Sequence, residues 1–402
     1  MPTYSQSRQR STNGSGSSSS EGTSTDVGSN QDAIEDLNAE QREQVVVYLT
    51  QNNVTHENDE IPETLAALKR ADQHGLGRKS LLPISDPFAN GHKTDQYAIG
   101  DQASTMTWWH DDKALESGQV RVGDKVLTLG AAKSADAADP AFVQKVQGDW
   151  LPLLTHVGLD EQRAQSVVSA LLTDQDGAAK LTASGGRAAN ELVQLIAVLN
   201  RAENGEFDIS SLVLSGHHYS GTDYLFGELP GHNYDTENFA GDMLSLKDIQ
   251  GLSAVFPKAF SQVNSVMFSA CNTHEIDMQD EAGQDMSTPD WVSEVFPNVD
   301  HLSFWEGIAP GSDLAAFWSG EFALDVARED SGQAEAFGDA LWRTTKKGEN
   351  RRAEKNADGE FETFDAKKNS KSYTYNNYKG YRNSGGEAFT SRADLMKYLY
   401  KR

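Results

Sequence analysis

The chain has 402 residues, of which 37% are hydrophobic, and its formal net charge at pH 7 is −25. This composition is typical of a globular protein, and its acidity excludes broad binding to nucleic acid, because phosphates would be repelled over most of the surface. The single cysteine, Cys271, excludes an internal disulfide and indicates a free thiol in a reducing compartment.

No run of about 18 consecutive apolar residues occurs, and the first 20 residues have no apolar stretch of the kind that signal peptides need. The sequence therefore predicts no membrane span, and a protein that is cytoplasmic or is delivered by a non-classical route. Residues 1–32 are mostly Ser, Gly, Thr, Asn and Gln. They bury too little apolar surface to offset the entropy of ordering, and they are predicted to form a disordered tail.

Residues 33–122 are expected to form a helical and irregular N-terminal segment. Apolar residues from Ile34 to Leu68, with Val45, Val46, Val47 and Leu49 among them, read as a small helical arm that ends at His74 and Gly75. Residues 76–122 contain several Pro, Gly and Asp and are expected to be irregular, with Trp108 and Trp109 as points of attachment.

Residues 123–345 alternate short β-branched runs with helical patterns. This alternation predicts an α/β domain with a mostly parallel sheet and helices on both of its faces. The strands are expected at 124–130, 211–215, 265–270 and 301–305. The helices are expected at 140–158, 162–173, 188–202, 246–263, 313–329 and 332–345.

Residues 346–402 form a basic, Tyr-rich C-terminal extension. From Arg343 onward there are 15 Lys and Arg against 8 Asp and Glu, so this part carries +7 and the rest −32. Interleaved Tyr and basic residues are compatible with nucleic-acid stacking. A strand pair or an extended arm that lies on the acidic body is the favoured interpretation, because the opposite charges attract.

Two predicted strands end in reactive side chains. The strand at 211–215 continues into Gly216, His217 and His218, and the strand at 265–270 continues into Cys271. Reactive groups of open parallel sheets lie beyond the carboxyl ends of the strands. A thiol becomes a good nucleophile once an imidazole takes its proton, and backbone N–H groups at Cys271 and just after the histidine could hold an oxyanion.

The segments Ser-Gly-His217 and Ser-Ala-Cys271-Asn-Thr, 54 residues apart, resemble the caspase, gingipain, separase and CHAT group of cysteine peptidases. The resemblance covers about Asp124 to Thr345 and implies a caspase-like fold. It also implies that His217 is the general base and acid, that Cys271 is the nucleophile and that Gly216 forms the turn. That group usually has Gly after the histidine, whereas this chain has His218. His218 therefore stays open as an alternative base, and as the source of a backbone oxyanion contact.

Candidate substrate-binding residues flank the two motifs. Asp223 and Asp277 are equal candidates for an acidic pocket that receives a basic side chain; Asp277 opens an acidic loop that is otherwise interpreted as solvated. Trp305 and Glu306 are candidates to line the cleft, because the fourth predicted strand should end beside Cys271.

The predicted function is a cysteine endopeptidase that cleaves a protein or peptide partner without a cofactor or metal. The resemblance implies a proteolytic switch in a bacterial defence or toxin system. One rival is a catalytically inactive caspase-like binding or effector module, suggested by the missing glycine. Another is a zinc-dependent hydrolase, since imidazole and thiolate groups are zinc ligands. Its candidate ligands are His217, His218, His232, Cys271 and His274.

Overall fold

A computed structural model describes the chain in separate segments. The described residues are 42–50, 54–73, 75–84, 119–122, 125–128, 140–174, 187–226, 243–280, 282–307, 309, 322–323, 326, 348–355, 358 and 360–364. All the described helices and strands belong to one unit, residues 43–402. The predicted tail at 1–32 lies outside the described residues.

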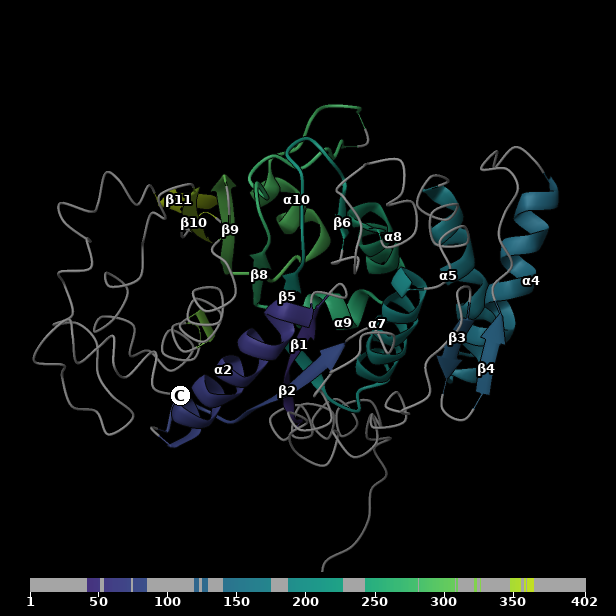
Figure 1. Ribbon diagram of the computed structural model, residues 1–402, viewed down its shortest axis with the longest axis horizontal. Coiled ribbons are helices and arrows are strands. Elements are labelled where there is room, and N and C mark those ends of the chain that lie inside the picture. The colour runs from purple at the N-terminus through teal and green to yellow at the C-terminus, as the bar shows by residue number, and fades with distance from the viewer. Residues whose placement is uncertain are drawn as a thin grey trace, which may run out of the picture. The chain divides into compact units, whose positions relative to one another are not determined.

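The centre of this unit is a seven-stranded sheet in the order β11-β10-β9-β8-β5-β1-β2 (Figure 1). The five strands from β9 to β2 are parallel, and β10 and β11 continue the sheet in antiparallel fashion. The sheet strands are β1 (Gln44–Leu49), β2 (Lys79–Ile84), β5 (Asp208–Ser215), β8 (Ser265–Ser269), β9 (His301–Gly307), β10 (Gly348–Lys355) and β11 (Phe361–Phe364).

The named helices are α2 (Val54–Gln73), α4 (Pro140–His156), α5 (Glu161–Thr173), α7 (Arg187–Glu203), α8 (Leu246–Val255), α9 (Pro257–Ser261) and α10 (Thr288–Val295). Two antiparallel pairs lie apart from the main sheet: β3 (Gln119–Val122) with β4 (Lys125–Thr128), and β6 (Tyr224–Phe226) with β7 (Met243–Ser245). At the start of α10, Ser287 and Asp290 form a reciprocal capping box.

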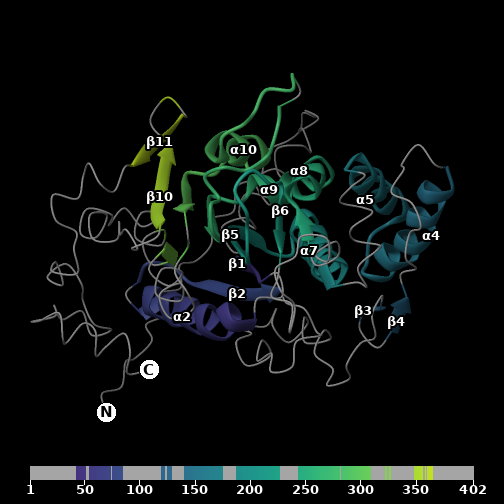
Figure 2. The same cartoon turned by 45° about the horizontal axis from the view of Figure 1, so that its top comes forward.

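The two faces of the sheet are covered by different helices, because successive strand residues point to opposite sides. The larger apolar cluster contains Val45, Leu212 and Phe268 and packs against α7, α8, α9 and α10, with α4 and α5 outside them. The smaller cluster contains Val46, Val213 and Met267 and packs against α2. Helix α2 lies along β1 and β2 in both ribbon views (Figures 1 and 2). Helices therefore flank both faces, as the sequence predicts.

The N-terminal segment differs most from the sequence-based expectation. The Val45–Leu49 run is strand β1 rather than part of a helical arm, and residues expected to be irregular form β2. A strand that is buried on both faces is a continuous apolar run without alternation, so its periodicity does not distinguish it from a buried helix. The run at 124–130, predicted as the first strand of the sheet, lies in the separate β3–β4 hairpin. Strands β1 and β2, which precede it in the sequence, belong to the main sheet instead.

The predicted helices at 140–158, 162–173 and 188–202 are confirmed as α4, α5 and α7. The helix expected at 246–263 is two helices, because Pro257 lacks the N–H that would continue the first one and begins α9 instead. Of the two arrangements expected after residue 346, a strand pair or an extended arm, the described part forms a strand pair, β10 and β11, which extends the main sheet, while 365–402 lie outside the described residues. Trp108, Trp109 and nearly all of 313–345 lie outside the described residues.

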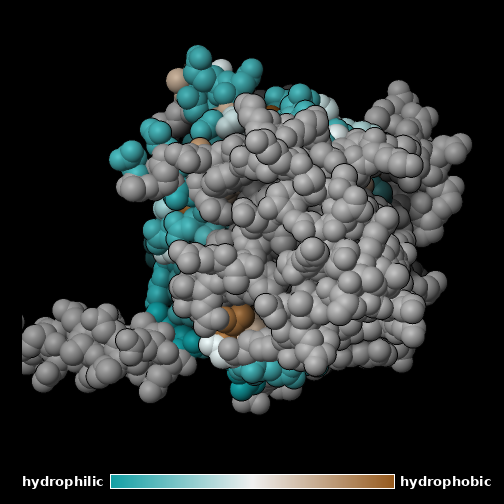
Figure 3. All heavy atoms as spheres, turned by 90° about the vertical axis from the view of Figure 1, so that its left-hand side faces the viewer, coloured by the Kyte–Doolittle hydropathy of each residue, from teal (hydrophilic) through white to brown (hydrophobic). Residues whose placement is uncertain are grey.

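Within the part of the chain that the structure describes, no helix is both long and apolar enough to cross a bilayer. The described residues visible on the face in Figure 3 are mostly hydrophilic, with one small apolar patch. Among the described residues, the one large hydrophobic side chain that is exposed is Tyr219, at 36%. It lies two residues after His217, so this exposed ring belongs to the loop that carries the first reactive motif.

Candidate active site

The reactive residues of the two motifs follow neighbouring parallel strands. The register pairs Ser211 with Ser265 and Ser215 with Ser269, a constant offset of 54 positions. The same offset of 54 separates His217 from Cys271, and each of them lies two residues after the last paired residue of its strand. Paired strands lie about 4.8 Å apart. The structure thus brings the two predicted catalytic residues to the same end of the sheet, as expected.

The turn after β5 is held by glycine geometry and by ring stacking. Gly216 has φ 153°, a backbone conformation that residues with a Cβ rarely adopt, and its N–H donates to the Ser269 carbonyl at 3.3 Å. His217 exchanges two backbone hydrogen bonds with Phe226, at 2.7 and 3.0 Å. The His217 ring stacks on the Phe226 ring at 5.4 Å between centroids, and Tyr219 stacks on Phe226 at 4.9 Å. These contacts fix the half-buried imidazole of His217.

The turn after β8 contains a strained residue directly next to the thiol. Asn272 has φ 52°, and among the described residues no other non-glycine residue has a positive φ. Its N–H donates to the Gly307 carbonyl at 2.6 Å, and the Thr273 hydroxyl accepts from the Trp305 N–H at 3.0 Å. The end of β9 therefore pins this turn, which explains how the unfavourable conformation persists.

Cys271 is half-buried and contacts the apolar cluster beneath α2. Burial raises the pKa of its thiol above the usual range, and the hydrogen bond from the Ala309 backbone N–H to the sulfur opposes that shift more weakly. A raised pKa favours the protonated thiol, so attack by this sulfur requires a base to take its proton.

His218 is buried, with 2% of its surface exposed. Its Nδ1 lies 3.0 Å from the Cys271 carbonyl oxygen and its Nε2 lies 3.1 Å from the Thr222 carbonyl oxygen. Burial lowers the pKa of His218, and the two carbonyl contacts raise it less. Because both ring nitrogens face backbone carbonyls, His218 is poorly arranged to accept the thiol proton. His218 is therefore the weaker of the two candidate bases.

Sequence reasoning missed Glu60, which lies on α2 with no exposed surface. Its carboxylate accepts hydrogen bonds from the hydroxyls of Ser215, at 3.4 Å, and Ser269, at 3.0 Å. These serines end β5 and β8, two residues before His217 and Cys271. The available signal was helical spacing: Glu60 shares the buried face of α2 with Thr64, Leu68 and Ala71, where a lone acid is unusual.

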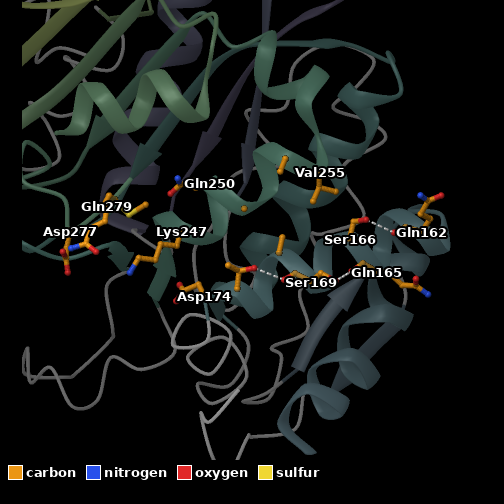
Figure 4. A pocket seen from close by; sticks show the side chains of 15 residues that line it. Gln162, Gln165, Ser166, Ser169, Asp174, Lys247, Gln250, Val255, Asp277 and Gln279 are labelled. Atoms are coloured by element: carbon orange, nitrogen blue, oxygen red, sulfur yellow. Dashed lines mark hydrogen bonds between the residues drawn. The ribbon is translucent and has the colours of Figure 1, made fainter. Parts of the chain in front are cut away.

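The two predicted acidic candidates lie around a lysine rather than around the thiol. Asp223 forms an ion pair with Lys247 at 2.9 Å, and Asp277 is exposed and acts on the same ammonium group. Lys247 and Asp277 line a groove of about 990 Å³ at α5 and α8, and Figure 4 shows Lys247 between Asp277 and Asp174. Asp223 is thus already paired with the Lys247 ammonium group, and Asp277 faces this groove.

The other two candidates lie on β9. Trp305 is 1% exposed and packs in the same apolar cluster that Cys271 contacts, so it belongs to the core rather than to the wall of a cleft. Large aromatic side chains are usually core residues, and this position follows that pattern. Glu306 is half-buried one position further along, where β9 pairs with β10.

Metal ligation has no structural support among the residues that are described. Within those ranges, no group of three or more His, Cys, Asp or Glu side chains could hold a metal ion. His232, one of the five candidate zinc ligands, lies outside them. His274 instead contacts the Glu275 carboxylate at 3.2 Å.

Comparison with family models, with curated proteins and with solved structures gives no match for this chain. The fold and the site are therefore interpreted from their own geometry and from the two sequence motifs.

Proposed function

We propose that this chain is a caspase-like cysteine endopeptidase, in which Cys271 attacks a peptide carbonyl and His217 moves the proton. One observation carries the proposal: His217 and Cys271 follow the carboxyl ends of the neighbouring parallel strands β5 and β8, each two residues after the last paired residue of its strand. The order β2-β1-β5-β8-β9 of five parallel strands, followed by antiparallel β10, is compatible with a caspase-like fold.

The chemistry follows from the protonated resting thiol. As the substrate carbonyl approaches, His217 takes the proton from Sγ, and an S–C bond forms while the carbonyl oxygen becomes an oxyanion. The imidazolium then gives this proton to the leaving amine as the peptide C–N bond breaks, which leaves a thioester. Water hydrolyses the thioester with His217 again as the base, and the free thiol returns.

Two features of the turns support this assignment. The strained backbone at Asn272 lies directly after the nucleophile, and such strain is concentrated at functional sites. The stacked rings of His217, Phe226 and Tyr219 hold the imidazole in one orientation, as a base that works twice in each cycle requires. The substrate is a protein or peptide, and a role as a proteolytic switch in a bacterial defence or toxin system follows from the resemblance alone.

The test is cleavage of a mixed peptide library by the full chain, together with labelling by peptides that carry a thiol-reactive electrophile. Wild type should cleave and be labelled, and Cys271→Ala should do neither. His217→Ala should reduce the cleavage rate by about 10²–10⁴, the usual contribution of a general base. Circular dichroism of each variant controls for folding.

A catalytically inactive binding module is the main rival, because the thiol is half-buried and its pKa is raised. Absence of both cleavage and labelling in wild type would favour that rival and overturn the peptidase. Equal cleavage by wild type and Cys271→Ala would also overturn it. A larger loss in His218→Ala than in His217→Ala, with both variants folded, would reassign the base.

A further inference from the structure

His218 joins the turns that carry the two reactive residues. It lies in the turn after β5, yet its Nδ1 contacts the carbonyl oxygen of Cys271 in the turn after β8, at 3.0 Å. Its Nε2 contacts the Thr222 carbonyl at 3.1 Å, so the ring spans from the thiol-bearing residue back to its own loop. At 2% exposure, this bridge is shielded from competing water.

The peptide unit between Cys271 and Asn272 is held at both of its polar ends. Its carbonyl oxygen faces His218, and its N–H donates to the Gly307 carbonyl of β9 at 2.6 Å. The C=O and N–H of a trans peptide point in opposite directions, so two such contacts fix the plane of the unit. Fixing this plane restricts ψ of Cys271 and φ of Asn272, the angle that is strained at 52°.

The neighbouring contacts join the same two loops further from the sulfur. Gly221 donates its N–H to the Glu275 carbonyl at 2.9 Å, and Asp277 donates its N–H to the Thr222 carbonyl at 3.0 Å. These bonds align the loop after β5 with the segment 275–277. Neither of these two bonds involves Cys271, whereas the His218 ring contacts the carbonyl oxygen of Cys271 itself.

The geometry points to His218 as a positioning residue: its ring holds the Cys271–Asn272 peptide so that the sulfur and the adjacent backbone donors keep the orientation that attack requires. This inference rests on the proposed peptidase function and deepens it. It gives a role to the side chain that stands where related peptidases have glycine. His218 thus acts through Cys271, while His217 handles the proton.

For this role, the side chain at position 218 must donate N–H hydrogen bonds and must be long enough to reach the carbonyl oxygens of both Cys271 and Thr222. The neutral ring donates to one of them in either tautomer, and the protonated ring donates to both. A glutamine amide carries two N–H donors and approaches the length of histidine, so His218→Gln should preserve the bridge. His218→Leu fills a similar volume but donates nothing. His218→Asn keeps the donors on a shorter side chain, which should fail to span both carbonyls.

The experiment measures peptide cleavage and alkylation of Cys271 by iodoacetamide for wild type and the three variants. Because Cys271 is the only cysteine of the chain, alkylation reports this site alone. We expect His218→Leu to lose about 10²-fold in kcat with little change in KM, the size of effect that misplacement of a reacting group causes. We also expect its alkylation to be faster than in wild type, because a loosened turn further exposes the half-buried thiol.

His218→Gln should stay close to wild type in both measurements, and His218→Asn should fall between Gln and Leu. His156→Gln, which changes an exposed histidine on α4, is the matched control and should alter neither. If His218→Leu does not fold, the contrast between Gln and Asn makes the same test.

Two results would overturn the inference: a His218→Gln variant as impaired as His218→Leu, or a folded Leu variant that matches wild type in both kcat and alkylation rate. Alkylation needs no substrate. It therefore tests the bridge even if the library is not cleaved, in which case the proposed function fails while an altered alkylation rate still supports the bridge.

Discussion

The two faces of the central sheet differ in what they bury. The face under α7 to α10 is lined almost entirely by apolar side chains such as Leu214 and Phe268. The face under α2 buries a carboxylate, Glu60, and two serine hydroxyls close to the thiol. Buried polar groups are costly unless they are hydrogen-bonded. At the carboxyl ends of β5 and β8, the polar cluster of Glu60, Ser215 and Ser269 lies on the same face as the apolar cluster that Cys271 contacts.

Substitution of two adjacent residues on β8 should have the largest effects, and it tests whether the two faces of the sheet act separately. Phe268→Ala should lower the free energy of unfolding by about 3–5 kcal/mol, and Met267→Ala by about 2–5 kcal/mol, since each leaves a cavity in a fully buried cluster. Only Met267 lies in the cluster that Cys271 contacts. Chemical denaturation should therefore show two destabilised variants, whereas the alkylation rate of Cys271 in the folded state should change for Met267→Ala alone. Equal changes in alkylation would mean that the two faces do not act separately.

Removing the buried carboxylate is the next largest change. Glu60→Ala leaves the Ser215 and Ser269 hydroxyls without this acceptor and should cost about 1–3 kcal/mol of stability, with altered reactivity of Cys271. Glu191→Ala removes another buried acid, which accepts from Thr50, and serves as the control. It should lower stability in urea unfolding without affecting the thiol. A Glu60→Ala variant that changes stability but not alkylation would show that the carboxylate serves the fold alone.

The third test uses pH. Because burial lowers the pKa of His218 in the folded state, the unfolded chain takes up the proton first. Stability from this group is therefore present above pH 6.5 and is lost as the pH falls from 6.5 through the folded pKa. The loss is about 1.4 kcal/mol for each pH unit between the unfolded and folded pKa values. Nearby Asp223 raises the folded pKa and His274 lowers it further. Thermal unfolding between pH 5 and 8 should show a smaller loss on the acid side in His218→Gln, whereas His156→Gln should follow wild type.

The smallest effect is expected from the ion pair that ties α8 to the histidine loop. Lys247 and Asp223 are in contact at 2.9 Å, but 45% of the lysine side chain is exposed, so Lys247→Met should cost only about 0.2–1 kcal/mol. Asp149→Asn removes a comparable pair with Lys145 on α4 and provides the control. If the link matters for the site, the KM for peptide should change in Lys247→Met and not in Asp149→Asn. An unchanged KM in both variants would limit the ion pair to a structural role.

The two strand ends and their reactive residues are predictable from the sequence, because glycine, histidine and cysteine directly after apolar β-branched runs are local signals. The sequence also predicted α4, α5 and α7, whose apolar spacing follows the helical period. It did not predict β1 and β2, because strands buried on both faces lack the alternation that identifies a half-buried strand.

The difference between the two histidines, and the contact of Glu60 with the ends of β5 and β8, depend on the folded chain. His217 and His218 are neighbours in sequence, yet one stacks on Phe226 while the other bridges two carbonyls, and these partners lie 9 and 53 residues away at Phe226 and Cys271. Glu60 reaches Ser269 across 209 positions. Contacts of this kind follow from strand order and register, which packing of the whole chain sets and which no local pattern encodes.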